Sequence, residues 1–128
     1  MAAVVLDTHA LTEWAARRPS TRLLAALEAA VQHEARVLVP TAVLVEALTG
    51  RPADAAVRHR VNRAEAVDLT LPLAAEAATR RQRWPNASVV DAVVAATAAT
   101  MGAAAVLTSD PDDLTGLLAG DAVHVVTV

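Results

Sequence analysis

Short apolar runs alternate with segments of helical periodicity along the whole chain, and this alternation constrains the fold more than any other feature. Such runs, a few residues long and rich in valine, are typical of buried strands. They occupy residues 3–6, 36–39, 66–69, 103–108 and 122–128. One helical segment directly follows residue 7, and further helical segments cover residues 19–33, 41–48, 53–64, 72–83, 88–101 and 111–118. The sequence therefore predicts an α/β fold, a three-layer α/β/α sandwich with a five-stranded parallel sheet.

Length and composition indicate a single folded domain over residues 1–128. Hydrophobic residues make up 55% of the chain and charged residues 20%, which excludes a disordered protein. Residues 92–109 carry no charge, but Gly102 divides them into a helical half and a strand-like half, so no membrane span is expected. No basic segment precedes the first apolar run, and we therefore expect a cytoplasmic protein.

Charge and cysteine content limit the chemistry that is open to the chain. With no cysteine, a metal ion would be bound through oxygen or imidazole. A net charge of −3 argues against a protein that coats nucleic acid through bulk electrostatics. All basic side chains are arginines, and they cluster near residues 17–22, 51–63 and 80–83. These clusters are either a local phosphate-binding rim or solvated helix faces with ion pairs.

Four carboxylates stand where apolar segments end or are interrupted. Asp7 ends the first predicted strand, Glu46 lies on the helix after the second, Asp91 starts the helix before the fourth, and Asp110 follows the fourth. Ligands of open parallel sheets bind at the carboxyl ends of the strands. We therefore expect the four acids to converge at one edge of the sheet.

Three of these acids also have a structural interpretation. Asp7 is well placed to cap the helix that follows it. Ser88 and Asp91 have the spacing of a capping box, and Asp110 before a proline is a typical helix start, with Asp113 at the box position. On this interpretation Asp113 is a capping or solvent-exposed residue.

Glu46 has the least comfortable structural explanation, because apolar residues surround it and an interior position is expected. Hard oxygen ligands of this kind bind Mg²⁺ or Mn²⁺, and such ions catalyse phosphodiester hydrolysis without an enzyme nucleophile. Without metal, the crowded acids would repel one another and raise at least one pKa. The set predicts a metal-dependent hydrolase in which Asp7, Glu46, Asp91 and Asp110 are both the catalytic residues and the metal ligands.

Four motifs resemble those of the PIN domain, in the order that the family shows. They are VVLDT at residues 4–8, VLVEAL at 43–48, DAVVAATA at 91–98 and LTSDPDDL at 107–114. The length and the third motif are similar to VapC-type toxins of toxin-antitoxin pairs.

The resemblance implies an endoribonuclease that depends on Mg²⁺ or Mn²⁺, cleaves an RNA substrate, forms a homodimer and is inhibited by a small cognate antitoxin. It implies that Asp7 and Asp91 bind the metal directly and that Glu46 and Asp110 complete the acidic pocket. One departure is His9, which is bulkier than the hydroxyl or amide residue that the family more often has there.

Two other functions remain open at this point. They are a non-catalytic PIN-like binding module and a housekeeping RNA-processing nuclease without an antitoxin. A receiver domain would need a lysine, which the sequence lacks, and His9 occupies the second acidic position of a phosphatase motif. Metal-dependent cleavage distinguishes an enzyme from a binding module.

Overall fold

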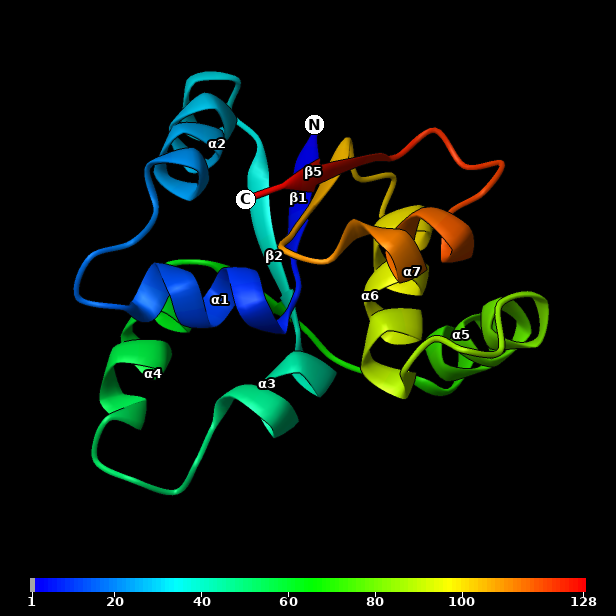
Figure 1. Cartoon of the computed structure of the whole chain (residues 1–128), viewed down its shortest axis with the longest axis horizontal. Coiled ribbons are helices and arrows are strands. Elements are labelled where there is room, and N and C mark those ends of the chain that lie inside the picture. The colour runs from blue at the N-terminus through cyan, green and yellow to red at the C-terminus, as the bar shows by residue number, and fades with distance from the viewer. Residues whose placement is uncertain (1) are drawn as a thin grey trace.

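The chain forms a five-stranded parallel sheet with helices on both sides (Figure 1). The computed structural model describes residues 2–128. The strands are β1 (Ala3–Leu6), β2 (Arg36–Pro40), β3 (Glu65–Val67), β4 (Ala105–Thr108) and β5 (His124–Thr127). The helices are α1 (Thr8–Ala15), α2 (Thr21–Gln32), α3 (Thr41–Ala47), α4 (Asp54–Asn62), α5 (Leu71–Arg83), α6 (Val89–Thr100) and α7 (Pro111–Leu117). Figure 1 shows α1, α2 and α4 on one side of the sheet and α5, α6 and α7 on the other, which confirms the three-layer prediction.

The order of the strands places β1 at the centre of the sheet. The order is β3-β2-β1-β4-β5, and all neighbours are parallel. The chain therefore runs outward from β1 through β2 to β3, then returns to the other side of β1 for β4 and β5. Ligands of open parallel sheets bind outside the carboxyl ends of the strands at such a reversal. Here the reversal lies between β1 and β4, where Asp7 donates its backbone N–H to the carbonyl of Leu107 at 3.2 Å.

Helix α6 is the central element of one helical layer. It contacts β1, β2 and β4, and residues 92–98 are all buried. Most of these residues are alanine and valine, whose small side chains let the helix lie close to the strands. Val5 and Leu6 on β1 are 0% exposed, and burying a side chain of this size contributes about 1.5–3 kcal/mol. The core thus fixes the first turn of α6, which carries Asp91, relative to the end of β1.

Several strand boundaries differ from the sequence prediction, and those of the third and fourth strands differ for clear physical reasons. The third strand, predicted at residues 66–69, is Glu65–Val67 because it pairs with the end of β2, where Pro40 lies opposite Val67. The fourth strand, predicted from residue 103, begins at Ala105. Gly102, with φ of 64°, ends α6, and the N–H of Ala103 still donates to the carbonyl of Ala98 at 2.8 Å. None of the helices within residues 2–128 has the length and apolar character needed to cross a bilayer.

Candidate functional site

Asp7 lies at the carboxyl end of β1 and is nearly inaccessible to solvent. Its side chain is the N-cap of α1 and accepts a hydrogen bond from the N–H of Ala10 at 2.8 Å, so the capping prediction is confirmed. Burial raises its pKa, although the Thr108 hydroxyl, the Ala10 N–H and the charge of His9 act in the opposite direction. One cap bond does not offset desolvation of the carboxylate. Asp7 is therefore a buried acid whose anionic form needs further compensation.

Asp91 lies in the first turn of α6 and is half-buried. Ser88 caps this helix and accepts from the N–H of Asp91 at 3.0 Å, as the capping-box spacing predicted. Burial is the largest cause that raises the pKa of Asp91 to about 6, and the negative charges of Asp7, Asp113 and Glu46 raise it further. The prediction that crowded acids would raise at least one pKa is thus confirmed. The charges of Asp7, Asp113 and Glu46 therefore all raise the pKa of Asp91.

Glu46 belongs to this acidic group, but the reason given from the sequence was wrong. Its side chain is exposed, and Val45 beside it is 82% exposed, so this face of α3 is open to solvent. The Thr8 hydroxyl donates to Glu46 Oε1 at 2.6 Å. This bond links α3 to the first residue of α1, directly after Asp7. Glu46 is therefore directed toward the carboxyl end of β1 without being part of the core.

Asp110 and Asp113, at the start of α7, differ in burial and in their effect on Asp91. Asp110 is exposed, lies at the N-cap position of α7 without a side-chain cap bond, and is not among the charges that raise the pKa of Asp91. Asp113, one turn later, is half-buried and does act on Asp91. It accepts a hydrogen bond from Nε1 of Trp84 at 3.0 Å. The interpretation of Asp113 as a capping or solvent-exposed residue was wrong, because it is half-buried and accepts from Trp84. The sequence does not indicate this bond, because Trp84 is distant along the chain.

The donor set fits a hard divalent cation by its chemistry. Its groups are the carboxylate after β1 and carboxylates on α3, α6 and α7. Burial desolvates Asp7 and Asp91, the other negative charges act on Asp91, and a cation would offset that repulsion. Within residues 2–128, no three carboxylate or imidazole groups are grouped closely enough to enclose an ion as they stand.

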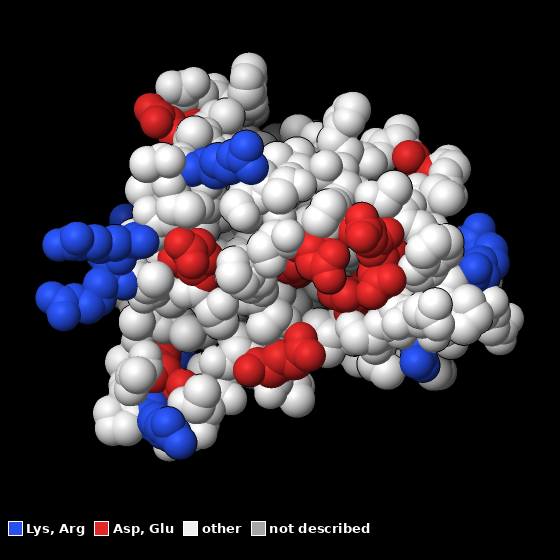
Figure 2. All heavy atoms as spheres, in the orientation of Figure 1, with Lys and Arg blue, Asp and Glu red and all other residues white. Residues whose placement is uncertain are grey.

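Figure 2 shows how charge is distributed around this site. Acidic side chains gather over α6 and α7, with a further group over α3, and arginine side chains lie toward the margins of the same face. One member of the predicted basic clusters does not belong to such a rim. Arg80 is only 5% exposed and forms an ion pair with Asp121, so its role is structural.

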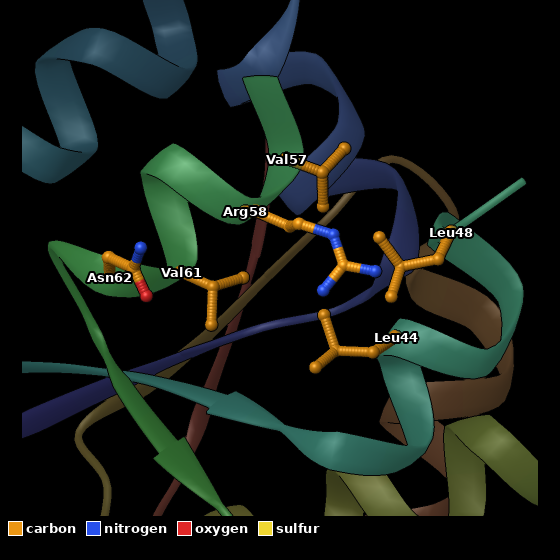
Figure 3. Close-up of a pocket in the computed structure, with 6 residues that line it drawn as sticks. All are labelled: Leu44, Leu48, Val57, Arg58, Val61 and Asn62. Carbon is orange, nitrogen blue, oxygen red and sulfur yellow. The ribbon is translucent and has the colours of Figure 1, made fainter. Parts of the chain in front are cut away.

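A groove of about 180 Å³ lies between α3 and α4, next to the helix that carries Glu46. Its walls are mainly apolar, and Figure 3 shows the guanidinium of Arg58 extending among these apolar side chains. The lining residues are Leu44, Leu48, Val57, Arg58, Val61 and Asn62. Within residues 2–128, Arg58 forms no ion pair with a carboxylate. The sequence does not predict this groove, because it depends on the packing of two helices.

The family model of the PIN domain matches residues 4–117, a span that includes all five acids described above. The chain belongs to the PIN-domain family. This membership confirms the family resemblance of the four motifs. PIN domains are generally metal-dependent nucleases. No protein among the curated sequences aligns with the chain at a significant level.

Solved structures with the same fold include complexes from two bacteria. VapBC2 from Rickettsia felis, bound to a DNA fragment from its promoter, contains a chain that matches with a TM-score of 0.77 and 12% identity, over 98% of both chains. FitAcB from Neisseria gonorrhoeae matches with a TM-score of 0.70 and 20% identity, over 94% of this chain and 96% of the other. FitAB bound to an IR36 DNA fragment matches with a TM-score of 0.69 and 20% identity. At these identities, the likeness concerns the fold.

Proposed function

We propose that this PIN domain, acting over residues 1–128 in the cytoplasm, is an endoribonuclease that depends on Mg²⁺ or Mn²⁺. The observation that carries the proposal is the placement of Asp7 and Asp91, which come from distant parts of the sequence. Asp7 is buried and Asp91 is half-buried at the carboxyl end of the central strands, and the pKa of each is raised. A fold seldom retains such uncompensated acids unless they have a function.

Asp7 and Asp91 would hold the metal and Glu46 would complete the acidic pocket, with Asp110 as its most exposed member at the start of α7. A bound ion would lower the pKa of a water molecule and neutralise charge on the scissile phosphate. Thr8 orients the carboxylate of Glu46 through the bond at 2.6 Å. Arginines at the margins of this face would bind the RNA backbone, since guanidinium groups recognise phosphate well. With two tryptophans as its only aromatic residues, the chain is unsuited to stacking successive bases.

Cleavage of a panel of structured RNAs by the purified protein tests this proposal. We expect cleavage with Mg²⁺ or Mn²⁺ and none with EDTA. Asp91→Asn should abolish cleavage while the circular dichroism spectrum stays unchanged, because amide and carboxylate have nearly the same size. Cleavage by Asp91→Asn at the wild-type rate would reject the assignment. RNA binding without any cleavage would favour the binding module.

We further propose that the protein is the toxin of a toxin-antitoxin pair. The resemblance of its motifs to VapC-type toxins supports this, as does the shared fold with chains of the VapBC2 and FitAB complexes. The groove between α3 and α4 is a suitable surface for an antitoxin, because it combines apolar walls with Arg58. Co-expression with a short neighbouring reading frame should yield a stable complex that lacks nuclease activity. Without such a partner, a housekeeping nuclease would be favoured.

A homodimer is the proposed assembly of the free protein. Val45 and Leu71 are 82% and 84% exposed, and the Leu69 N–H donates to the Thr41 hydroxyl at 3.2 Å, which brings this segment beside α3. Exposed apolar side chains that lie together commonly mark an interface. Leu71→Asp should convert the dimer to a monomer in sedimentation velocity. A wild-type protein that sediments as a monomer at all concentrations would contradict this assembly.

A further inference from the structure

The last turn of α5 holds helix α7 in place through two residues that are four positions apart. Arg80 donates to the carbonyl of Leu117 at 2.8 Å and to Asp121 Oδ2 at 2.6 Å. Trp84, the C-cap residue of α5, lies one turn later and contacts the same helix. Residues with this spacing lie on one face of a helix. The end of α5 therefore contacts α7 at both its middle and its C-terminal end.

The contact between Trp84 and α7 depends on Gly116. A Cβ atom added at Gly116 would lie 2.4 Å from Cδ2 and Cε2 of the Trp84 ring. That separation is far below van der Waals contact, so the ring lies directly on the backbone of α7. No other residue allows the ring to take this position without a shift. Gly116 and Trp84 thus fix the position of the indole N–H.

That N–H donates to Asp113 Oδ1 at 3.0 Å. An indole is a neutral donor with one hydrogen to give, so it orients the carboxylate without cancelling its charge. Asp121, at the other end of the same contact, is paired instead with the guanidinium of Arg80. The two acids are thus held differently: Asp121 is paired with a cation, whereas Asp113 accepts from a neutral donor that leaves its second carboxylate oxygen unused.

Asp113 lies near enough to the candidate site for its charge to act on Asp91. Helices α6 and α7 pack together, and acidic side chains gather over both (Figure 2). Trp84 also begins the short loop to Ser88, the N-cap of the helix that carries Asp91. Within this loop the Ala87 N–H donates to the Trp84 carbonyl at 3.2 Å. One residue therefore contacts Asp113 directly and is tied to the segment that places Asp91.

We propose that Asp113 is a further carboxylate facing the divalent cation of this PIN domain, and that Trp84 is the residue that positions it. The proposal rests on the proposed metal-dependent function. The hydrogen bond to the indole restricts the conformations of the Asp113 side chain, whose charge acts on Asp91. A carboxylate that is already oriented loses less conformational entropy when it binds a cation.

Nuclear magnetic resonance of the indole groups tests the geometry without any activity measurement. Trp14 and Trp84 are the only tryptophans, so ¹⁵N-labelled protein gives two indole cross-peaks, and Trp14→Phe assigns them. Asp113→Asn should move the Trp84 peak and leave the Trp14 peak in place. Titration with Mg²⁺ should also move the Trp84 peak selectively. A Trp84 peak that ignores both changes would overturn the proposal.

Calorimetric titration with Mn²⁺ tests the positioning role. Trp84→Phe keeps the ring on Gly116 but removes the donor, and we expect its dissociation constant for Mn²⁺ to rise about tenfold. Trp14→Phe is the matched control and should bind as the wild type does. Asp113→Asn should weaken binding at least as much as Trp84→Phe. The double variant should be no weaker than Asp113→Asn alone, because the indole acts through that carboxylate.

The outcomes separate this inference from the proposed function. If the wild type binds Mn²⁺, Asp91→Asn does not, and both Trp84→Phe and Asp113→Asn bind normally, the nuclease assignment stands and this inference is wrong. If the wild type binds no Mn²⁺, both proposals fail together. Additive losses in the double variant would show that Trp84 acts on folding and not through Asp113, which also overturns the positioning role.

Discussion

Asp7 and Asp54 are equally inaccessible, each 7% exposed, yet the structure treats them in opposite ways. Asp54 accepts from the backbone N–H groups of Thr49 and Gly50 and from the Thr49 hydroxyl at 2.7–2.9 Å, and these bonds lower its pKa. Asp7 has one backbone cap bond, and burial raises its pKa. An acid that serves the fold is surrounded by donors. An acid that is left short of donors is available for a ligand.

The largest expected effect is on catalysis and separates these two acids. Asp7→Asn should reduce metal-dependent RNA cleavage on the order of a thousandfold, because the cation and its charge stabilisation are lost. It should leave the metal-free protein at least as stable as the wild type. Asp54→Asn should have the reverse pattern, with a lower midpoint of thermal unfolding and cleavage retained at temperatures where it is folded. If both variants lose only stability, the contrast between the two acids is wrong.

Arg80 gives the second largest effect, on stability alone. This guanidinium is 5% exposed and serves Asp121 and the carbonyl of Leu117. Arg80→Met should lower the free energy of unfolding by about 3 kcal/mol, since it leaves a carboxylate without its partner. Urea denaturation measures this change. Arg83→Met, at another exposed position of the same helix, is the matched control and should change stability little.

Addition of metal should stabilise the wild type by a similar but smaller amount. Mg²⁺ at a hundred times its dissociation constant raises the free energy of unfolding by about 2.7 kcal/mol if it binds only the folded state. The midpoint of thermal unfolding should therefore rise with Mg²⁺ and return with EDTA. Asp91→Asn should show no such rise. An equal rise in that variant would mean that Mg²⁺ binds elsewhere.

The smallest effect is on the pH dependence of stability. The pKa of Asp91 is about 6 in the folded protein, above its ordinary value of 3.8. Between these values the folded state holds a proton that the unfolded state has released, so this group makes the metal-free protein less stable as pH rises. Asp54 and Asp121 have lowered pKa values and lose their contribution only below the ordinary value. The stability difference between wild type and Asp91→Asn should therefore shrink from about pH 7 to about pH 5. A constant difference would exclude this titration.

The sequence predicts what depends on local pattern and fails where packing decides. The strand ending at Leu6 and the helix ended by Gly102 follow from apolar runs and a glycine with positive φ. The observed range of the edge strand β3 differs from the predicted one, because its limits depend on pairing with β2.

The candidate site shows the same division. Asp7 and Asp91 were identifiable because each directly ends or starts an element that the core fixes. Glu46 was expected inside, but apolar neighbours on a helix with an open face do not bury a residue. The sequence does not indicate that Asp113 acts on Asp91. The hydrogen bond that holds Asp113 comes from Trp84, which is distant along the chain and belongs to none of the motifs.

Calorimetry with Mn²⁺ at neutral pH on wild type, Asp91→Asn and Asp54→Asn tests the central claim, that Asp7 and Asp91 hold a divalent cation. We predict a saturable binding isotherm for the wild type, no heat beyond dilution for Asp91→Asn, and wild-type binding for folded Asp54→Asn. Equal binding by wild type and Asp91→Asn, or no binding by the wild type, would contradict the claim.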